Sequence, residues 1–399
     1  MKYFLTLIIC LFLFGSSFAD IQQAQTVHQY IVVEAYKLLK AQLGYDIPTL
    51  QAHIGTTEIG SNSFNPGWLV VIGAYREDEE DIVFYHKWPN KSSTHFWDPD
   101  RGDDSHFCNT INQCFENAYY KARKFIYGGY ELRIPYPGNG IIEAYDAPPD
   151  LAEFYKDGKI YYKGYYEMST GRFITRNRWS TLSQYYRDVL TWEILGRVAH
   201  LLADVGVPAH AHNDQHDPTL GGSDSYEEYM STAYQNWNWQ YALAQEVAWG
   251  NRINVINNSN PLKYLFYTTA QIANHFPSDD VPGNNVWDIN DPFNLYPPLE
   301  SIMNTLGTPP SFVYVNDIAS KAYVYSIRAT AALFHWFATE AGIMPSPPTP
   351  LAVSISGPTS IAIGHAGEST WNAAATGGNP PYHYQWWYKY PACQYKSNK

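Results

Sequence analysis

The chain has 399 residues, of which 45% are hydrophobic and 16% charged. This apolar content is enough for a large core and excludes an intrinsically disordered chain. The 26 basic and 38 acidic residues give a formal net charge of −12, which argues against a general nucleic-acid-binding protein.

The amino-terminal segment predicts a cleaved secretory signal. A basic Lys2 precedes the apolar run Tyr3–Phe14, and Ala19 supplies a small residue where signal peptidase cuts. The run is too short for a membrane span, which needs ~20 residues. We therefore expect residues 1–19 to be a signal peptide, the mature chain to start at Asp20, and the protein to be secreted or held at the cell surface.

Three cysteines remain after that cleavage, namely Cys108, Cys114 and Cys393. An oxidising compartment would permit a disulfide between Cys108 and Cys114, which would close a small loop. Because three is an odd number, free thiols are an equal alternative.

Apolar residues then recur at helical spacing along most of the chain and predict a bundle of helices. The expected helices are Val27–Leu39, Phe115–Tyr127, Leu182–Ala203, Tyr226–Trp249, Leu262–Ala273 and Ile318–Ala341. Long connections rich in glycine, proline and asparagine separate them, and loops of this length in a compact domain usually carry function. A tyrosine-rich segment predicts a short hairpin near Ile160–Tyr166.

The composition changes at residues 345–350, which form a proline-rich, semi-rigid linker. Period-two alternation behind the linker predicts three strands of a β-sandwich, at Leu351–Ser356, Ser369–Ala374 and Tyr382–Tyr388. We therefore expect a helical domain over residues 20–344 and a partial β-sandwich over residues 351–399.

Candidate metal ligands concentrate at the end of one predicted helix. His200 and Asp204 are four residues apart, which places an imidazole and a carboxylate on one helix face. Pro208 is expected to end this helix, and His210 follows it on backbone that turns away. An isolated histidine and aspartate at this spacing are more often a surface pair.

Other candidate ligands lie in three further places. Asp78 belongs to an acidic run and His95 to an Asp- and His-rich segment, His28 lies within the apolar pattern of the first helix, and Asp224 and Glu227 precede a later helix. Each has an ordinary explanation: a solvated acidic face or a turn, a core histidine, and an N-cap with acidic first-turn residues. A cluster of cations would explain why they occur together.

In this order the segments resemble the secreted zinc-dependent phospholipases C, the family of α-toxin-like lecithinases, which are distantly related to single-strand-specific zinc nucleases. The matching segments are His28–Ala35, Gly73–Glu79, Thr94–Asp100 and Leu195–His210. Their order and helical context cover about Gln22 to Phe334. The resemblance implies an all-α, multi-helix catalytic domain whose cleft holds two or three zinc ions.

The resemblance also implies the ligand set. Its zinc ligands would be His28, Asp78, His95, His200, Asp204, His210 and Glu227. Asp78 would bridge ions and orient or deprotonate the attacking water, and so act as the catalytic residue.

Two positions depart from the family pattern. The family's amino-terminal tryptophan, which binds one zinc ion, is missing because Asp20 is the expected start. Four residues before Glu227, where the family has a histidine, this chain has Ser223. Zinc accepts carboxylate and imidazole ligands alike, so Asp224 is our first candidate to replace it, with His216 and Asp214 as alternatives.

The tail resembles the immunoglobulin-like (Ig-like) repeats of bacterial surface and secreted proteins, at Ser356–Ile361 and Gly377–Trp387. It is about half as long as a complete sandwich of this kind, which has ~100 residues. The tail occupies the position in the chain where α-toxin-like enzymes have a lipid-binding β-sandwich. The resemblance of the helical domain therefore does not imply that this protein binds membranes in the same way.

The predicted function is a zinc-dependent phosphodiester hydrolase, first of all a phospholipase C that releases a phosphorylated head group by zinc-activated water. Its substrate would be a phospholipid or another phosphodiester, with room for a peripheral membrane contact and no stable nucleic-acid partner. Tyr75, Phe96 and Trp97 are candidates to contact a choline head group or a base. A single-strand nuclease is the second hypothesis, and a non-enzymatic surface or adhesion protein, favoured by the tail and by Ser223, is the third.

Overall fold

The computed structural model describes most of the chain from Phe18 onward. The described residues are 18–55, 67–79, 81–84, 86, 90–109, 112–128, 131–135, 141–146, 150–157, 161–167, 172–174, 187–215, 224–249, 255, 258–287, 298–345, 352–358, 370–376, 386–389 and 395–398. Nearly all of the predicted signal peptide lies outside them.

The chain divides into two compact units. The first comprises Met1–Leu43 and Ile47–Met344, and the second comprises Pro345–Lys399 together with Gly44–Asp46. Residues 346–350 of the predicted linker lie outside the described residues.

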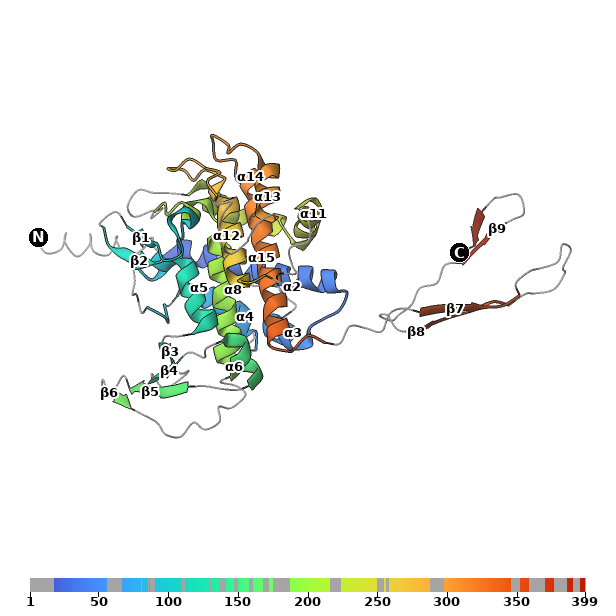
Figure 1. The fold of residues 1–399 in the computed structure, drawn as a ribbon, viewed down its shortest axis with the longest axis horizontal. Coiled ribbons are helices and arrows are strands. Elements are labelled where there is room, and N and C mark those ends of the chain that lie inside the picture. Colours follow the sequence, from blue (N-terminus) through green and yellow to red (C-terminus); the bar gives the residue numbers. More distant parts are fainter. Residues whose placement is uncertain are drawn as a thin grey trace, which may run out of the picture. The chain divides into compact units, whose positions relative to one another are not determined.

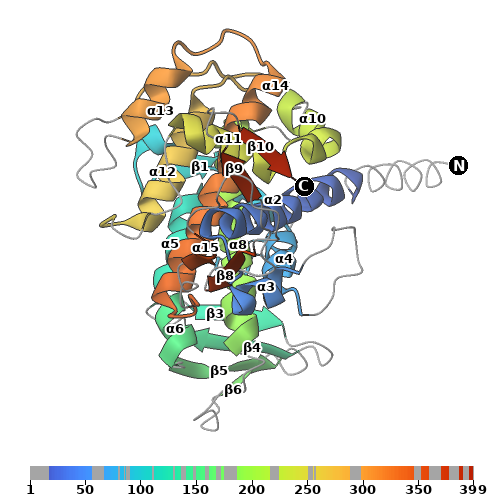
Figure 2. The same cartoon turned by 90° about the vertical axis from the view of Figure 1, so that its right-hand side faces the viewer.

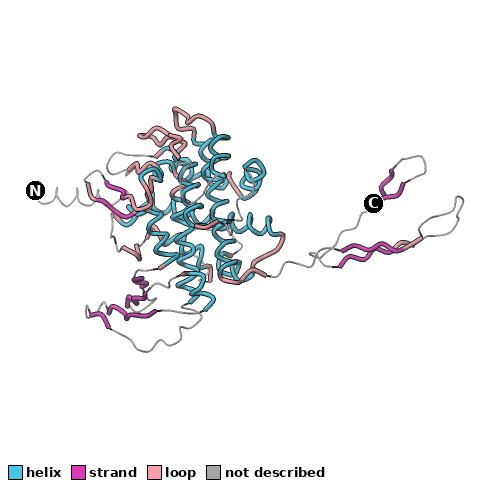
Figure 3. Tube along the Cα trace, in the orientation of Figure 1, coloured by secondary structure: helices cyan, strands magenta, loops and turns pink. Residues whose placement is uncertain are grey.

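The first unit is mostly helical, in keeping with the predicted all-α class (Figures 1 and 3). Its α-helices are α2 (Phe18–Leu43), α3 (Pro48–Ile54), α4 (Leu69–Arg76), α5 (Ala118–Tyr127), α6 (Leu151–Asp157), α8 (Ile194–Asp204), α9 (Pro208–Ala211), α10 (Ser225–Ala233), α11 (Trp239–Trp249), α12 (Pro261–Asn274), α13 (Pro298–Leu306), α14 (Val315–Ile318) and α15 (Val324–Glu340). Short 3-10 turns are η1 (Lys91–Thr94), η2 (Pro99–Arg101) and η5 (Tyr234–Asn236), and π-helical turns η3 (Val189–Glu193) and η6 (Ala319–Tyr323) precede α8 and α15.

The same unit also contains two small antiparallel sheets. Its strands are β1 (His106–Cys108), β2 (Cys114–Glu116), β3 (Glu131–Pro135), β4 (Ile141–Asp146), β5 (Tyr161–Glu167) and β6 (Arg172–Ile174). A disulfide joins Cys108 and Cys114, which face each other across β1 and β2. Near Ile160–Tyr166, where the sequence predicts a hairpin, the described residues Tyr161–Glu167 form the single strand β5, which pairs with β4 and β6 in a four-stranded sheet of order β3-β4-β5-β6. This sheet lies at the opposite end of the unit from α10, α13 and α14 (Figure 2).

Helix α8 is the centre of the bundle. It packs against α2, α4, α5, α12 and α15, and all of its residues are buried (Figure 1). A helix surrounded on all sides is normally apolar all round. The polar side chains of α8 are therefore buried as well, and buried polar groups need partners.

Helices α4 and α8 approach each other through two glycines. A Cβ atom on Gly73 would lie 1.9 Å from the carbonyl oxygen of Glu193, and one on Gly196 would lie 2.0 Å from that of Val70. No other residue type fits at either position without moving a backbone. This contact places the end of α4 beside the face of α8 that carries His200.

Several predicted helix boundaries are wrong: α2 begins at Phe18 and not near Val27, and further differences concern α5, α8 and the segment of α10 and α11. Asn117 accepts a hydrogen bond from the backbone N–H of Tyr120 and starts α5 there, so Phe115 belongs to β2. The long helix expected over residues 226–249 is interrupted between α10 and α11, where the Asn238 side chain accepts from the N–H of Gln240. Such side chains compete with the helical hydrogen bonds of the backbone. Helix α8 ends at Asp204, and Pro208 begins α9 instead of ending α8.

The second unit contains two separate antiparallel hairpins. One pairs β7 (Ala352–Ser356) with β8 (Asn372–Thr376), and the other pairs β9 (Trp386–Lys389) with β10 (Tyr395–Asn398). The tail prediction therefore missed β10, and the described strands do not build a β-sandwich. Across the described residues of both units, no helix has the length and apolar character needed to cross a bilayer.

Candidate metal centre

The His200 and Asp204 side chains meet at the end of α8. His200 is 0% and Asp204 2% exposed, and Nε2 of the histidine lies 3.0 Å from Oδ2 of the aspartate. The alternative of a surface pair is therefore wrong. Two buried polar groups at the centre of the bundle form the base of the site.

Two further histidines converge on the Asp204 carboxylate. Its Oδ2 lies 2.9 Å from Nδ1 of His95, which follows η1. Its Oδ1 lies 3.1 Å from Nε2 of His28 on α2. The His28 ring also stacks on that of His200, with 3.7 Å between the ring centroids. One carboxylate thus has imidazole nitrogens against both of its oxygens.

Asp78, two residues beyond the end of α4, adds a second carboxylate. Its Oδ1 lies 3.4 Å from Nε2 of His200 and 3.5 Å from Nδ1 of His95. Two groups of three side chains therefore have ligand atoms within 4.8 Å of one another: His28, Asp78 and His200, and His95, His200 and Asp204. His200 belongs to both groups.

The hydrogen bonding of His200 decides which atom faces this cluster. Its Nδ1 lies 2.7 Å from the carbonyl oxygen of Ala74. A carbonyl oxygen can only accept, so Nδ1 carries the proton and donates it. Nε2 is left facing two carboxylates, and Nε2, Asp78 Oδ2 and Asp204 Oδ2 are buried without a hydrogen bond of regular geometry. Lone pairs that converge in this way need a proton or a cation between them.

The electrostatics of the cluster agree with that requirement. Burial alone would raise the pKa of both carboxyls, but the histidines hold the pKa of Asp204 well below its ordinary value and lower that of Asp78 to about 2. Burial would lower the pKa of His200, yet Asp204 and Asp78 raise it well above the ordinary value. Both carboxylates are therefore ionised at neutral pH, and positive charge is favoured at the centre.

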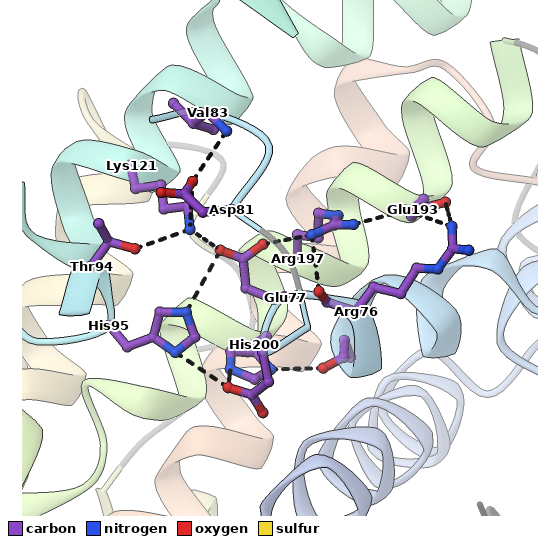
Figure 4. A network of polar contacts seen from close by, with 12 residues as sticks. Arg76, Glu77, Asp81, Val83, Thr94, His95, Lys121, Glu193, Arg197 and His200 are labelled. Atoms are coloured by element: carbon purple, nitrogen blue, oxygen red, sulfur yellow. Dashed lines mark hydrogen bonds and ion pairs between the residues drawn. The ribbon is translucent and has the colours of Figure 1, made fainter. Parts of the chain in front are cut away.

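No lysine or arginine of the described residues supplies that charge to Asp78 or Asp204, so without a metal ion it would have to come from a protonated His200. Neither Asp78 nor Asp204 forms an ion pair with a lysine or arginine there. Lys121 and Arg197 lie close by, but both bind the neighbouring Glu77 (Figure 4). The set of imidazole nitrogens and carboxylate oxygens matches the ligands that zinc takes in proteins. These residues therefore fit a divalent metal ion.

The remaining predicted ligands lie at one edge of this cluster. His210 Nδ1 lies 3.7 Å from Asp204 Oδ1, and His210 Nε2 lies 3.7 Å from Glu227 Oε1. Asp224 Oδ1 accepts a hydrogen bond from the N–H of Glu227 and caps α10. Among the described residues, none of these three belongs to a three-membered ligand group. Their role as ligands stays a prediction.

The alternative replacements for Ser223 are placed only in part. Asp214 accepts a hydrogen bond of 2.6 Å from the Ser278 hydroxyl. His216 and Ser223 lie outside the described residues.

The aromatic candidates near the site are mostly core residues. Trp97 is 0% exposed and stacks on Tyr119, so the expectation that it contacts a head group is wrong. Phe96 is 8% exposed and packs against His210 and Phe107. Only Tyr75 of the three is half-exposed.

The sequence interpretation missed Glu77, Lys121 and Arg197, which are all fully buried beside the cluster. Nothing in the sequence distinguishes Glu77 from the other acidic residues of its run. Arg197 did carry a signal, because it lies among apolar residues one turn before His200 in a strongly hydrophobic helix. Comparison with known proteins adds no assignment, since no protein-family model and no curated protein matches this chain.

Proposed function

We propose that the protein is an exported zinc-dependent phosphodiester hydrolase of the phospholipase C type. The observation that carries the proposal is the position of His200: its Nδ1 donates a hydrogen bond to the Ala74 carbonyl, and its Nε2 faces two ionised carboxylates, those of the buried Asp204 and the partly exposed Asp78. The resemblance of the ligand-bearing segments to zinc phospholipases C supports the choice of metal and reaction.

The chain offers two adjoining ion positions. His95, His200 and Asp204 would hold one ion, and His28 and Asp78, with the other oxygen of Asp204, would contribute to the second. We therefore assign the bridging role, which the resemblance gave to Asp78, to Asp204, because its two oxygens face different histidines. Zinc bound there would lower the pKa of a bound water and stabilise negative charge on the phosphate.

Asp78 remains the proposed catalytic carboxylate. Its side chain is 14% exposed, whereas that of Asp204 is 3% exposed, so Asp78 is the more accessible of the two. Its Oδ2 has no hydrogen-bond partner, and its pKa of about 2 keeps it ionised at neutral pH. It can therefore orient the attacking water molecule by accepting a hydrogen bond from it.

The proposed substrate is a phospholipid, with another phosphodiester as the wider class. A surface with a net charge of −12 repels a polyanion such as single-stranded DNA more strongly than a single phosphodiester. Membrane contact would then be peripheral.

The test uses the full-length protein. We expect bound zinc by mass spectrometry, hydrolysis of phosphatidylcholine, and reversible loss of activity when a chelator removes the metal. Single-stranded DNA, assayed side by side, tests the nuclease hypothesis. A His53→Ala variant is the control, because His53 contacts Gly67 and Trp192 outside the cluster. Absence of bound zinc, or full activity after its removal, would overturn the proposal.

A further inference from the structure

A second buried polar cluster adjoins the candidate metal centre, and Glu77 is its hub (Figure 4). The Glu77 side chain is 0% exposed. Its Oε1 pairs with the Lys121 ammonium of α5, and its Oε2 lies 3.1 Å from Nη1 of Arg197 on α8. Two helices are therefore tied to one carboxylate in the turn after α4.

Glu77 and the residues it contacts lie close to proposed metal ligands along the chain. Glu77 directly precedes Asp78 in the chain, and Arg197 lies one turn before His200 on α8. Lys121 also donates a hydrogen bond of 3.0 Å to the hydroxyl of Thr94, the residue before His95.

His95 also meets the hub directly. Its Nε2 lies 3.8 Å from Glu77 Oε1, while its Nδ1 faces Asp204. The three ligand-bearing segments, which are far apart in the sequence, thus share a single anchoring carboxylate.

We propose that Glu77 is a positioning residue that holds Asp78, His95 and His200 at ion-binding distances before an ion arrives. This inference rests on the metal centre proposed above. Ligands that are fixed in advance lose less conformational freedom on binding, which raises affinity. Partners that orient metal ligands typically contribute 10–100-fold to metal affinity.

The charge of the hub supports a positioning role. Besides Glu77, Lys121 also pairs with Asp81, and Arg197 also pairs with Glu193. Arg76 forms a second ion pair with Glu193. Three acidic and three basic side chains balance one another. The Glu77 cluster therefore has no net charge with which to attract or repel a metal ion. Its contribution is the placement of the ligands.

The decisive experiment measures zinc affinity in the metal-stripped, full-length protein by competition with a chromophoric chelator. We expect Glu77→Gln to weaken zinc binding by about 10–100-fold. Glu193→Gln is the matched control, because it removes a buried carboxylate from the same cluster without adjoining a ligand. Its affinity should stay within about twofold of the wild type, a margin well below the 10-fold lower limit for partners that orient ligands.

A purely structural role predicts a different pattern. The melting temperature of each metal-free variant reports that role separately from affinity. If Glu77→Gln melts at a lower temperature but binds zinc as tightly as the wild type, or if Glu193→Gln weakens binding equally, the proposal is overturned.

A second variant covers the case in which Glu77→Gln does not fold. Glu77→Gln combined with Lys121→Met removes one charge of each sign, and such replacement of a buried pair is often tolerated. We expect this double variant to fold and still to bind zinc at least about 10-fold more weakly. Wild-type affinity in the double variant would refute the positioning role.

The outcomes separate this inference from the proposed function. Zinc binding without hydrolysis in the wild type would remove the function and leave the positioning role intact. Equal zinc affinity in wild type and Glu77→Gln would remove the positioning role and leave the function intact.

Discussion

The candidate metal centre and the Glu77 cluster are adjacent, both are largely buried and both contain ionisable side chains, yet their charges are arranged differently. In the Glu77 cluster each carboxylate pairs with a lysine or an arginine. In the metal centre two carboxylates face only histidines, and buried atoms lack regular hydrogen bonds. Burial of charge therefore does not mark a binding site. A buried group of carboxylates that no lysine or arginine balances is the better candidate for one.

The largest expected effect comes from removing a ligand from the metal centre. His200→Ala, and separately Asp204→Ala, should lower zinc affinity and phosphodiesterase activity by more than about 100-fold, since loss of an outer partner alone costs up to that much. Bound zinc by mass spectrometry and initial hydrolysis rates check this. Full zinc content and activity in either variant would show that the histidines and aspartates only pair with one another.

The next effect concerns the contact that brings both clusters together. A methyl group on Gly73 would collide with the Glu193 backbone, so Gly73→Ala should force α4 away from α8. We expect a loss of about 3 kcal/mol in the free energy of unfolding, together with weaker zinc binding. Urea denaturation measures the first and chelator competition the second. Unchanged stability would mean that the two helices can separate without cost.

The stability that the Glu77 cluster gives to the fold should depend on pH. Burial alone would raise the pKa of Asp81, but Lys121, His86 and backbone N–H groups lower it far below its ordinary value. A depressed pKa stabilises the fold above the unfolded value of about 4, and this stabilisation is lost as the pH falls below it.

Asp81→Asn should therefore flatten the decline of stability below about pH 4, by roughly 2 kcal/mol. Thermal melts of the metal-free protein between about pH 5 and 2.5 span this range. An identical acid profile for variant and wild type would contradict the assignment of that stability to Asp81.

The smallest effect separates two roles of Asp224. Serine caps a helix about as well as aspartate but has no carboxylate, whereas alanine loses the cap at a cost of about 1 kcal/mol. If Asp224 is also a metal ligand, Asp224→Ser and Asp224→Ala should both lower the zinc stoichiometry by one, and only the alanine variant should lose stability. Unchanged stoichiometry in both variants would leave Asp224 as a helix cap alone.

The sequence could predict the central helices, and which side chains meet in the candidate metal centre, for a definite reason. Helical periodicity puts His200 and Asp204 on one face whatever surrounds them, and the resemblance adds His28, Asp78 and His95. It could not identify Glu77, because burial within an acidic run depends on which helices pack over it. The sequence also shows no sign of the break between α10 and α11, where the Asn238 side chain accepts a hydrogen bond from the backbone N–H of Gln240.

The hydrogen bond between His200 and Ala74 has a kinetic consequence. It joins residues 126 positions apart in the chain, so the correctly oriented imidazole exists only after α4 and α8 have docked. Contacts of such long sequence separation are slow to form because a long loop must close first. If this docking follows the main folding barrier, an ion that needs the imidazole would slow unfolding and leave the folding rate nearly unchanged. Zinc would thus govern how long the native state lasts more than how quickly it is reached.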